Sequence, residues 1–167
     1  MTRCLISIGS NQNEPQLQIK SAFEQLDQIY EQVELSELYL TEPVGQVKQE
    51  TFLNAAISLE TKSTPQQLLK QLLDIECLAG RNRDSEIPKG PRNLDLDIIL
   101  FGNEILQSES LIIPHPRYRE RRFVLAPLST IAPEHVDPVS QKSISQLLFE
   151  CPDTSWVKPL INEPLVV

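Results

Sequence analysis

The stretch Arg92-Asn93-Leu94-Asp95-Leu96-Asp97-Ile98-Ile99-Leu100 sets two acids into a strongly apolar run. Successive side chains of a β-strand point to opposite faces, so this alternation predicts a strand over residues 93–101. Asp95 and Asp97 then share one face. The opposite face is apolar and carries Leu94, Leu96, Ile98 and Leu100. The stretch therefore predicts a strand that is buried on one face and presents both carboxylates on the other.

The two carboxylates are close enough to act together. Their Cα atoms would lie about 6–7 Å apart in a strand. Such a pair repels itself unless a cation lies between the two groups, and it suits Mg²⁺, which keeps several waters and takes further ligands from substrate phosphates. The alternative is an edge strand with two acids on its solvated face. The long basic loop over residues 80–92, directly before the acids, favours the metal site.

Outward from this strand, the remaining elements follow a regular order. Apolar or alternating stretches predict strands at residues 5–8, 33–40 and 52–59. Two helices are marked by their start signals: Asn13 as N-cap with Pro15 in the first turn, and the capping box Thr64-Pro65-Gln66-Gln67 of a helix that ends at Gly80. The resulting βαββαβ order predicts an α+β ferredoxin-like sandwich, an antiparallel sheet with two helices packed on one face.

The length of 167 residues fits a single domain, so we expect residues 1–167 to form one. A further short helix is predicted near residues 123–131. After about residue 138 the pattern predicts no particular element, and this part is expected to be a C-terminal extension.

Charge is unevenly distributed along the chain. The net charge is −8, yet eight of the 15 basic residues lie in the two short segments 80–92 and 115–122. This pattern favours a small bound polyanion and excludes a broad nucleic-acid surface. No apolar run is long enough to cross a membrane, and three cysteines without a pairing pattern indicate a reducing compartment. We therefore expect a cytoplasmic protein that is a monomer and has no nucleic-acid or membrane partner.

Two further residues are candidates for the site. Glu76 falls within the apolar stripe of the second helix, where a carboxylate is costly unless it is paired. It either pairs with a nearby arginine such as Arg81 or helps to hold the basic loop or metal-bound waters. His115 lies between two prolines and near Arg121, where both side chains suit a phosphate; the alternative is a purely structural histidine.

Absent motifs exclude several enzyme classes. The sequence has no G-x-x-x-x-G-K-[ST] or G-x-G-x-x-G motif, no G-x-S-x-G motif and no cysteine–histidine spacing typical of zinc. A phosphate-handling enzyme of this sequence would therefore use metal ions and arginines in place of a glycine-rich cradle.

Several stretches together resemble the 6-hydroxymethyl-7,8-dihydropterin pyrophosphokinase family of the folate pathway. The two specific ones are Gly90-Pro91-Arg92-Asn93-Leu94-Asp95-Leu96-Asp97-Ile98 and Ile113-Pro114-His115-Pro116-Arg117, the latter continuing through Arg121-Arg122-Phe123 to Leu128. Supporting stretches are Ile8–Asn11, Phe52–Ala56 and Glu76–Arg83. The resemblance implies a ferredoxin-like fold and an ATP-dependent diphosphokinase, which transfers pyrophosphate from ATP to the hydroxymethyl group of the pterin and releases AMP.

The resemblance also implies roles for individual residues. Asp95 and Asp97 would hold two Mg²⁺ ions, and Arg81 and Arg92 would act in catalysis as a clamp on the polyphosphate. The ATP-binding residues would be Glu76, Arg81, Arg83, Arg92, Ile98, His115 and Arg121. The pterin-binding residues would be Thr41, Val44, Phe52, Asn54, Asp95 and Phe123, with the two phenylalanines on either side of the flat ring.

The sequence departs from the family pattern at two places. Lys89, preceded by Pro88, stands where an aromatic residue usually precedes Gly-Pro-Arg, and Gln12-Asn13 replace a usual glycine. Two alternatives remain beside the pyrophosphokinase. One is another Mg²⁺-dependent phosphoryl or nucleotidyl transferase of the same fold with a different acceptor, and the other is a non-catalytic ligand-binding domain.

Overall fold

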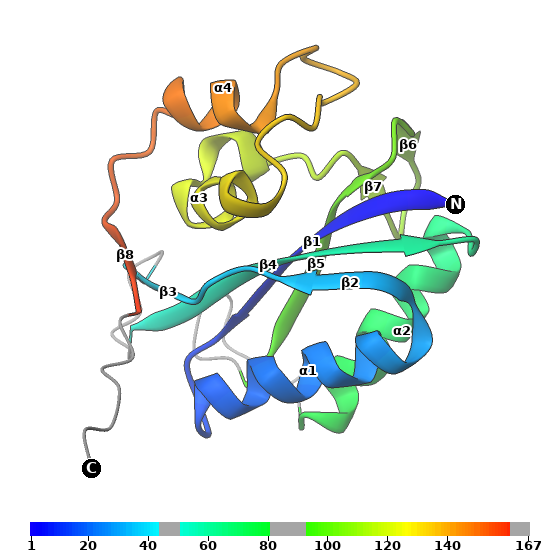
Figure 1. The fold of residues 1–167 in the computed structure, drawn as a ribbon, viewed down its shortest axis with the longest axis vertical. Helices are drawn as coiled ribbons and strands as arrows, with labels where there is room; N and C mark the ends of the chain where they lie inside the picture. The colour runs from blue at the N-terminus through cyan, green and yellow to red at the C-terminus, as the bar shows by residue number, and fades with distance from the viewer. Residues whose placement is uncertain (44–50, 81–92, 161–167) are drawn as a thin grey trace.

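The computed structural model describes residues 1–43, 51–80 and 93–160. Its main feature is an antiparallel sheet with the strand order β5-β1-β4-β3-β8, in which β2 also pairs with β4 (Figure 1). The strands of this sheet are β1 (Thr2–Ser10), β2 (Glu31–Leu35), β3 (Tyr39–Thr41), β4 (Phe52–Thr61), β5 (Asp95–Phe101) and β8 (Val157–Pro159).

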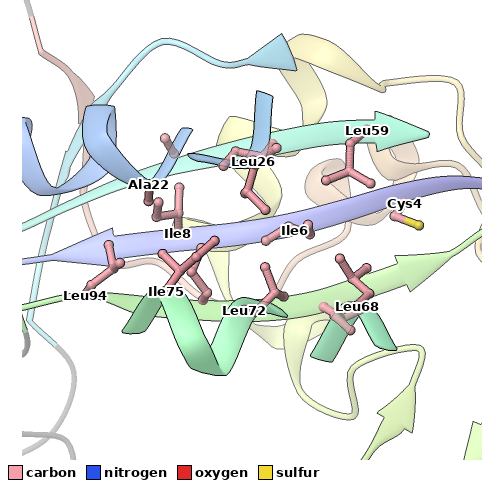
Figure 2. Packing of buried hydrophobic residues seen from close by; sticks show 14 of the residues in the cluster. Cys4, Ile6, Ile8, Ala22, Leu26, Leu59, Leu68, Leu72, Ile75 and Leu94 are labelled. Carbon is pink, nitrogen blue, oxygen red and sulfur yellow. The ribbon is translucent and has the colours of Figure 1, made fainter. Parts of the chain in front are cut away.

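Helices α1 (Pro15–Ile29) and α2 (Pro65–Leu78) cover one face of the sheet (Figure 1). The larger core lies between them and the sheet, where side chains of β1 such as Ile6 and Ile8 meet Leu26 of α1 and Leu72 of α2 (Figure 2). The predicted α+β fold is confirmed, with the central strands in the order that the ferredoxin-like arrangement requires.

The opposite face of the sheet is covered by a second layer that the sequence pattern predicted only in part. Helix α3 (Arg122–Ile131) matches the short predicted helix, and α4 (Ile144–Phe149) follows it beside the same face (Figure 1). A smaller core of residues such as Leu5, Ala56 and Leu125 lies beneath α3. A hairpin of β6 (Leu106–Gln107) and β7 (Ile112–Ile113) and a 3-10 helix (Tyr118–Glu120) connect β5 to this layer. Residues 139–160, for which the sequence pattern predicted no particular element, contain α4 and the strand β8, which pairs with β3.

Three local predictions differ from the structure. Residues 33–40 do not form one strand, because the regular pairing with β4 is interrupted at residues 36–38, where the Ser36 hydroxyl accepts a hydrogen bond from the Ala56 N–H (2.8 Å). Asn13 is not the N-cap of α1: Glu14 is, and it makes no side-chain capping bond. The capping box of α2 is confirmed, since Thr64 and Gln67 bond each other's backbone N–H.

The third difference is a β-bulge in β5. The pairing of β1 with β5 shifts between Leu5 and Ile6, so that Ile99 is an extra residue on β5. The predicted alternation therefore ends there. Leu100 lies in the α3-side core together with Ile99, instead of sharing a face with Ile98. Asp95 and Asp97 precede the bulge and keep the predicted shared face.

Among the described residues, no helix is both long enough and apolar enough to cross a membrane.

Candidate active site

The predicted site residues on three strands meet on the α3-side face of the sheet. Pairing aligns Asp95 of β5 with Gly9 of β1, Gly9 with Asn54 of β4, and Asn54 with Tyr39 of β3. With neighbouring strands about 4.8 Å apart, Asp95 and Asn54 are separated by roughly 10 Å. The adjacent row aligns Phe52 with Thr41. The sheet therefore sets two acids beside a row of amide, hydroxyl and aromatic side chains.

The position between Asp95 and Asn54 has no room for a Cβ atom unless the Asn54 side chain shifts. A Cβ atom at Gly9 would lie 2.6 Å from Asn54 Nδ2, which is too close for any real side chain. Asn54 is buried, and its Oδ1 accepts a hydrogen bond from the Thr41 hydroxyl (2.6 Å). This bond fixes the amide, and the missing side chain at Gly9 leaves room for it. Gly9 belongs to the stretch Ile8–Asn11 that resembles the family, but no sequence pattern predicted this role.

The start of β5 is held by hydrogen bonds around Asn93. Its Nδ2 donates to the carbonyl of Ala79 (2.9 Å), and its Oδ1 accepts from Asn13 Nδ2 (2.7 Å). The Ser10 hydroxyl donates to the Asn93 carbonyl. Because Asn93 lies two residues before Asp95, these bonds fix the point where the acidic stretch begins.

Glu76 is buried, as predicted, with only 2% of its surface exposed. Its Oε2 accepts a hydrogen bond from the Leu96 N–H (2.8 Å), on the residue between Asp95 and Asp97. This bond joins helix α2 to the backbone of β5 between Asp95 and Asp97. The partner suggested by the sequence, Arg81, lies outside the described residues.

His115 is held against the bulge of β5, because its backbone N–H donates to the carbonyl of Ile99 (2.9 Å). Burial and then the positive charge of Arg121 lower the pKa of His115 to about 4, although Asp95 acts in the opposite direction. The ring is therefore neutral near pH 7. Its Nδ1 accepts from the Arg117 N–H (3.1 Å), which leaves the proton on Nε2, where it can be donated to a ligand.

Arg121 and Phe123 flank the first residue of α3. Arg121 is both the C-cap of the 3-10 helix and the N-cap of α3. Its guanidinium carbon lies 5.8 Å from the centre of the Phe123 ring, within the range of a cation–π contact. The start of α3 therefore brings a cation and an aromatic ring to the face that carries the acids.

The structure does not describe every predicted site residue. Val44, Arg81, Arg83 and Arg92 lie outside the described residues, as does the unusual pair Pro88-Lys89. Ile98 is described, and its side chain is buried in the core shared with α1 and α2. A contact between Ile98 and a nucleotide would therefore use its main-chain atoms.

The two acids fit Mg²⁺ better than a metal that needs a full set of protein ligands. The described residues contain no group of three or more histidine, cysteine, aspartate or glutamate side chains that could hold a metal ion. Zinc needs three or four such ligands, whereas Mg²⁺ is commonly held by one or two carboxylates together with water and substrate phosphates. Asp95 and Asp97 provide that smaller set.

Comparison with known proteins identifies relatives over most of the chain. Residues 5–133 match the family model described as 7,8-dihydro-6-hydroxymethylpterin-pyrophosphokinase. The 2-amino-4-hydroxy-6-hydroxymethyldihydropteridine pyrophosphokinase of Pseudomonas aeruginosa is 39% identical over 152 residues, which covers 90% of this chain and 92% of the relative. The enzyme of the same name from Haemophilus influenzae is 39% identical over 160 residues, 95% of this chain and 98% of the relative.

Solved structures show the same fold at lower sequence identity. The Plasmodium falciparum HPPK-DHPS structure with pteroate superposes with a TM-score of 0.69 at 15% identity. The match covers 90% of this chain and 42% of that longer one, so the chain spans less than half of its length. That likeness shows the fold, while the bacterial relatives and the family model show the family. The chain belongs to the 7,8-dihydro-6-hydroxymethylpterin-pyrophosphokinase family.

Proposed function

We propose that the chain transfers the β,γ-diphosphate of ATP to the hydroxymethyl group of 6-hydroxymethyl-7,8-dihydropterin in a Mg²⁺-dependent reaction that releases AMP. The observation that carries this proposal is the row Asp95–Gly9–Asn54 across three strands. It sets Asp95, one of the two candidate metal ligands, about two strand spacings from a fixed amide that suits a planar heterocycle. Family membership supports the same substrates.

The acceptor binds at the β4 and β3 end of this row. Asn54, oriented by Thr41, hydrogen-bonds the edge of the pterin, and the rings of Phe52 and Phe123 lie on its two faces. Aromatic stacking with a few fixed polar groups suits a flat ring rich in donors and acceptors. Val44 adds to this binding site, and Asp95 lies at the end nearest the hydroxymethyl group.

The nucleotide binds at the β5 and α3 end. Arg121 contacts the phosphates, and neutral His115 donates from Nε2. Arg81, Arg83 and Arg92, which lie outside the described residues, would supply further positive charge to the polyphosphate. Glu76 acts on this side by holding the backbone at Leu96. Cations at these positions stabilise the charge that develops on the transferred phosphoryl group.

In the reaction, the pterin hydroxyl oxygen bonds to the β-phosphorus as the bond from that phosphorus to the α,β-bridging oxygen breaks. The diphosphate moves to the pterin, AMP leaves, and the hydroxyl proton passes to solvent. Asp95 and Asp97 would hold two Mg²⁺ ions, which neutralise phosphate charge and align the two substrates when bound.

The test is the release of AMP from ATP and Mg²⁺ with and without the pterin, for the unaltered chain and for Asp97→Ala. We expect AMP only when both the pterin and Asp97 are present. Asp74→Asn, a change of an exposed acid on α2, is the matched control and should keep full activity. AMP formation that requires Asp97 but not the pterin would favour a transferase with another acceptor. Absence of both AMP formation and pterin binding would contradict the proposal.

We further propose that residues 1–167 act as a single domain and as a monomer in the cytoplasm. The two helical layers share one sheet, and all three cysteines are free thiols, which suits a reducing compartment. Sedimentation equilibrium tests the monomer directly: a mass of about twice the 19.0 kDa of the chain would contradict it.

A further inference from the structure

The segment from Asp153 to Pro159 lies outside the residues matched by the family model, yet it contacts both sides of the proposed pterin site. The family match ends at residue 133. From the end of α4 the chain crosses to the far edge of the sheet and adds β8 beside β3 (Figure 1). Its two ends make different contacts, one with α3 and one with β3.

At the first end, Asp153 caps helix α3 from outside the helix. Its Oδ2 accepts a hydrogen bond from the N–H of Arg122, the first residue of α3, at 3.0 Å. Its Oδ1 accepts from the Ser155 N–H (2.9 Å), which orients the carboxylate. The N-cap residue of α3, Arg121, makes no side-chain capping bond. A carboxylate at this position satisfies an otherwise unpaired N–H and is favoured by the helix dipole.

At the other end, the segment pairs with β3 beside residues of the proposed site. Val157 is in register with Thr41, whose hydroxyl fixes Asn54. The pairing is extended on both sides: the Glu42 N–H donates to the Trp156 carbonyl (3.3 Å), and the Leu160 N–H donates to the Leu38 carbonyl (2.8 Å).

We propose that residues 153–159 form a strap that fixes the start of α3 relative to β3 and so determines how tightly the pterin is bound. Asp153 is its positioning residue, because it accepts the hydrogen bond from the Arg122 N–H, and Arg122 lies between the proposed site residues Arg121 and Phe123. The inference rests on the proposed function, in which Phe123 and the Thr41–Asn54 pair contact the pterin. Loosening the strap should affect the pterin more than the nucleotide, since both of its ends reach pterin-binding residues, whereas only the α3 end reaches a nucleotide-binding residue, Arg121.

The experiment compares Asp153→Ala with Asp153→Asn. Alanine removes the acceptor for the Arg122 N–H, and we expect the pterin Kd to rise about five- to tenfold, while the Kd for MgATP changes less than about twofold. Asparagine keeps an acceptor oxygen and is a good capping residue, so it should restore pterin binding to within about twofold. Binding is measured by calorimetry with each ligand alone.

A matched control separates positioning from stability. Ser143 caps α4 by accepting from the Gln146 N–H (3.1 Å), in the same layer and outside the proposed site. Ser143→Ala should therefore lower the melting temperature about as much as Asp153→Ala and leave the pterin Kd unchanged. If Asp153→Ala binds the pterin as tightly as Ser143→Ala and the unaltered chain do, the strap does not position the site.

Amide hydrogen exchange tests the strap without any ligand. In Asp153→Ala, but not in Ser143→Ala, exchange at the Glu42 and Leu160 amides should become faster, because the two ends of the strap are linked. Unchanged exchange at these amides would overturn the inference whatever the chain's activity. Absence of pterin binding by the unaltered chain, with the exchange effect present, would instead contradict the proposed function and confine the strap to linking α3 and β3.

Discussion

Gly9 shows how one missing side chain shapes the proposed site. It lies between Asp95 and Asn54 across the sheet, with a carboxylate on the neighbouring strand β5 and an amide on the neighbouring strand β4. A Cβ atom there would lie 2.6 Å from Asn54 Nδ2. Because Asn54 is buried and bonded to Thr41, the amide has little freedom to move aside.

Gly9→Ala should therefore weaken pterin binding at least about tenfold, which corresponds to about 1.4 kcal/mol, and leave MgATP binding nearly unchanged. The added methyl group displaces the Asn54 amide and breaks its bond to Thr41. Calorimetry with each ligand alone provides the measurement. In the double variant Gly9→Ala/Asn54→Ala, the second change should add little, since the amide is already misplaced. Fully additive losses would show that Gly9 acts independently of Asn54.

At the residue scale, the sequence predicted which side chains are exceptional better than it predicted their partners. Burial of Glu76 followed from its place on an apolar helix stripe and is confirmed. Its bond to the Leu96 N–H could not be predicted, because it depends on how α2 packs against β5. Asn13 was expected to cap α1, but its side chain instead bonds Asn93, which lies 80 residues away in the sequence.

At the scale of helices and strands, features set by neighbouring residues could be predicted from the sequence, and features set by pairing with distant residues could not. The capping box at Thr64 was predictable because both of its bonds form within four residues. The break between β2 and β3 depends on the bond between Ser36 and Ala56, and the bulge at Ile99 depends on the register with β1. Strand β8 has only three residues and exists through its pairing with β3, so no local pattern marks it.

The coupling of α2 to β5 leads to a prediction about Glu76. Glu76→Leu leaves the buried Leu96 N–H without this acceptor and should lower the free energy of unfolding by about 1–3 kcal/mol. Glu76→Gln keeps an acceptor oxygen and should cost less. Urea unfolding measures both. MgATP affinity should fall in the leucine variant alone, because the backbone between Asp95 and Asp97 loses its support.

Asp74→Leu is the control for this comparison, since it changes an exposed acid on the same helix. Equal losses in Glu76→Leu and Glu76→Gln would show that the negative charge of Glu76, and not its acceptor oxygen, supports β5.

At the scale of the whole molecule, the second layer is joined by a buried polar cluster around Asp137. This carboxylate is completely buried and accepts hydrogen bonds from the Tyr118 hydroxyl and from Arg119 Nε (2.6 Å). It also accepts from the N–H groups of Val139 (2.7 Å) and Ser140 (3.2 Å). The cluster ties the turn before α4 to the 3-10 helix that precedes Arg121. The sequence pattern gave no sign of it, because its members lie about twenty residues apart.

Asp137→Asn should lower the free energy of unfolding by about 3 kcal/mol near pH 7, because it leaves the partly buried Arg119 without its charged partner. Urea unfolding provides the measurement. Lys70 and Asp74 form an exposed pair on α2, so Asp74→Asn should change stability little in the same assay.

The pH dependence of this loss tests its cause. Burial favours the neutral carboxyl, but hydrogen bonds from Arg119 and Tyr118 outweigh burial and hold the pKa of Asp137 below its ordinary value. Such a group stabilises the fold fully above the unfolded-state pKa of about 3.9, and this stabilisation is lost as the pH falls through the lower folded-state pKa. The stability difference between the unaltered chain and Asp137→Asn should therefore stay constant from about pH 7 to 5 and shrink below about pH 4. A difference that stays unchanged into the acid range would show that packing around Asp137, and not its charge, joins the layer.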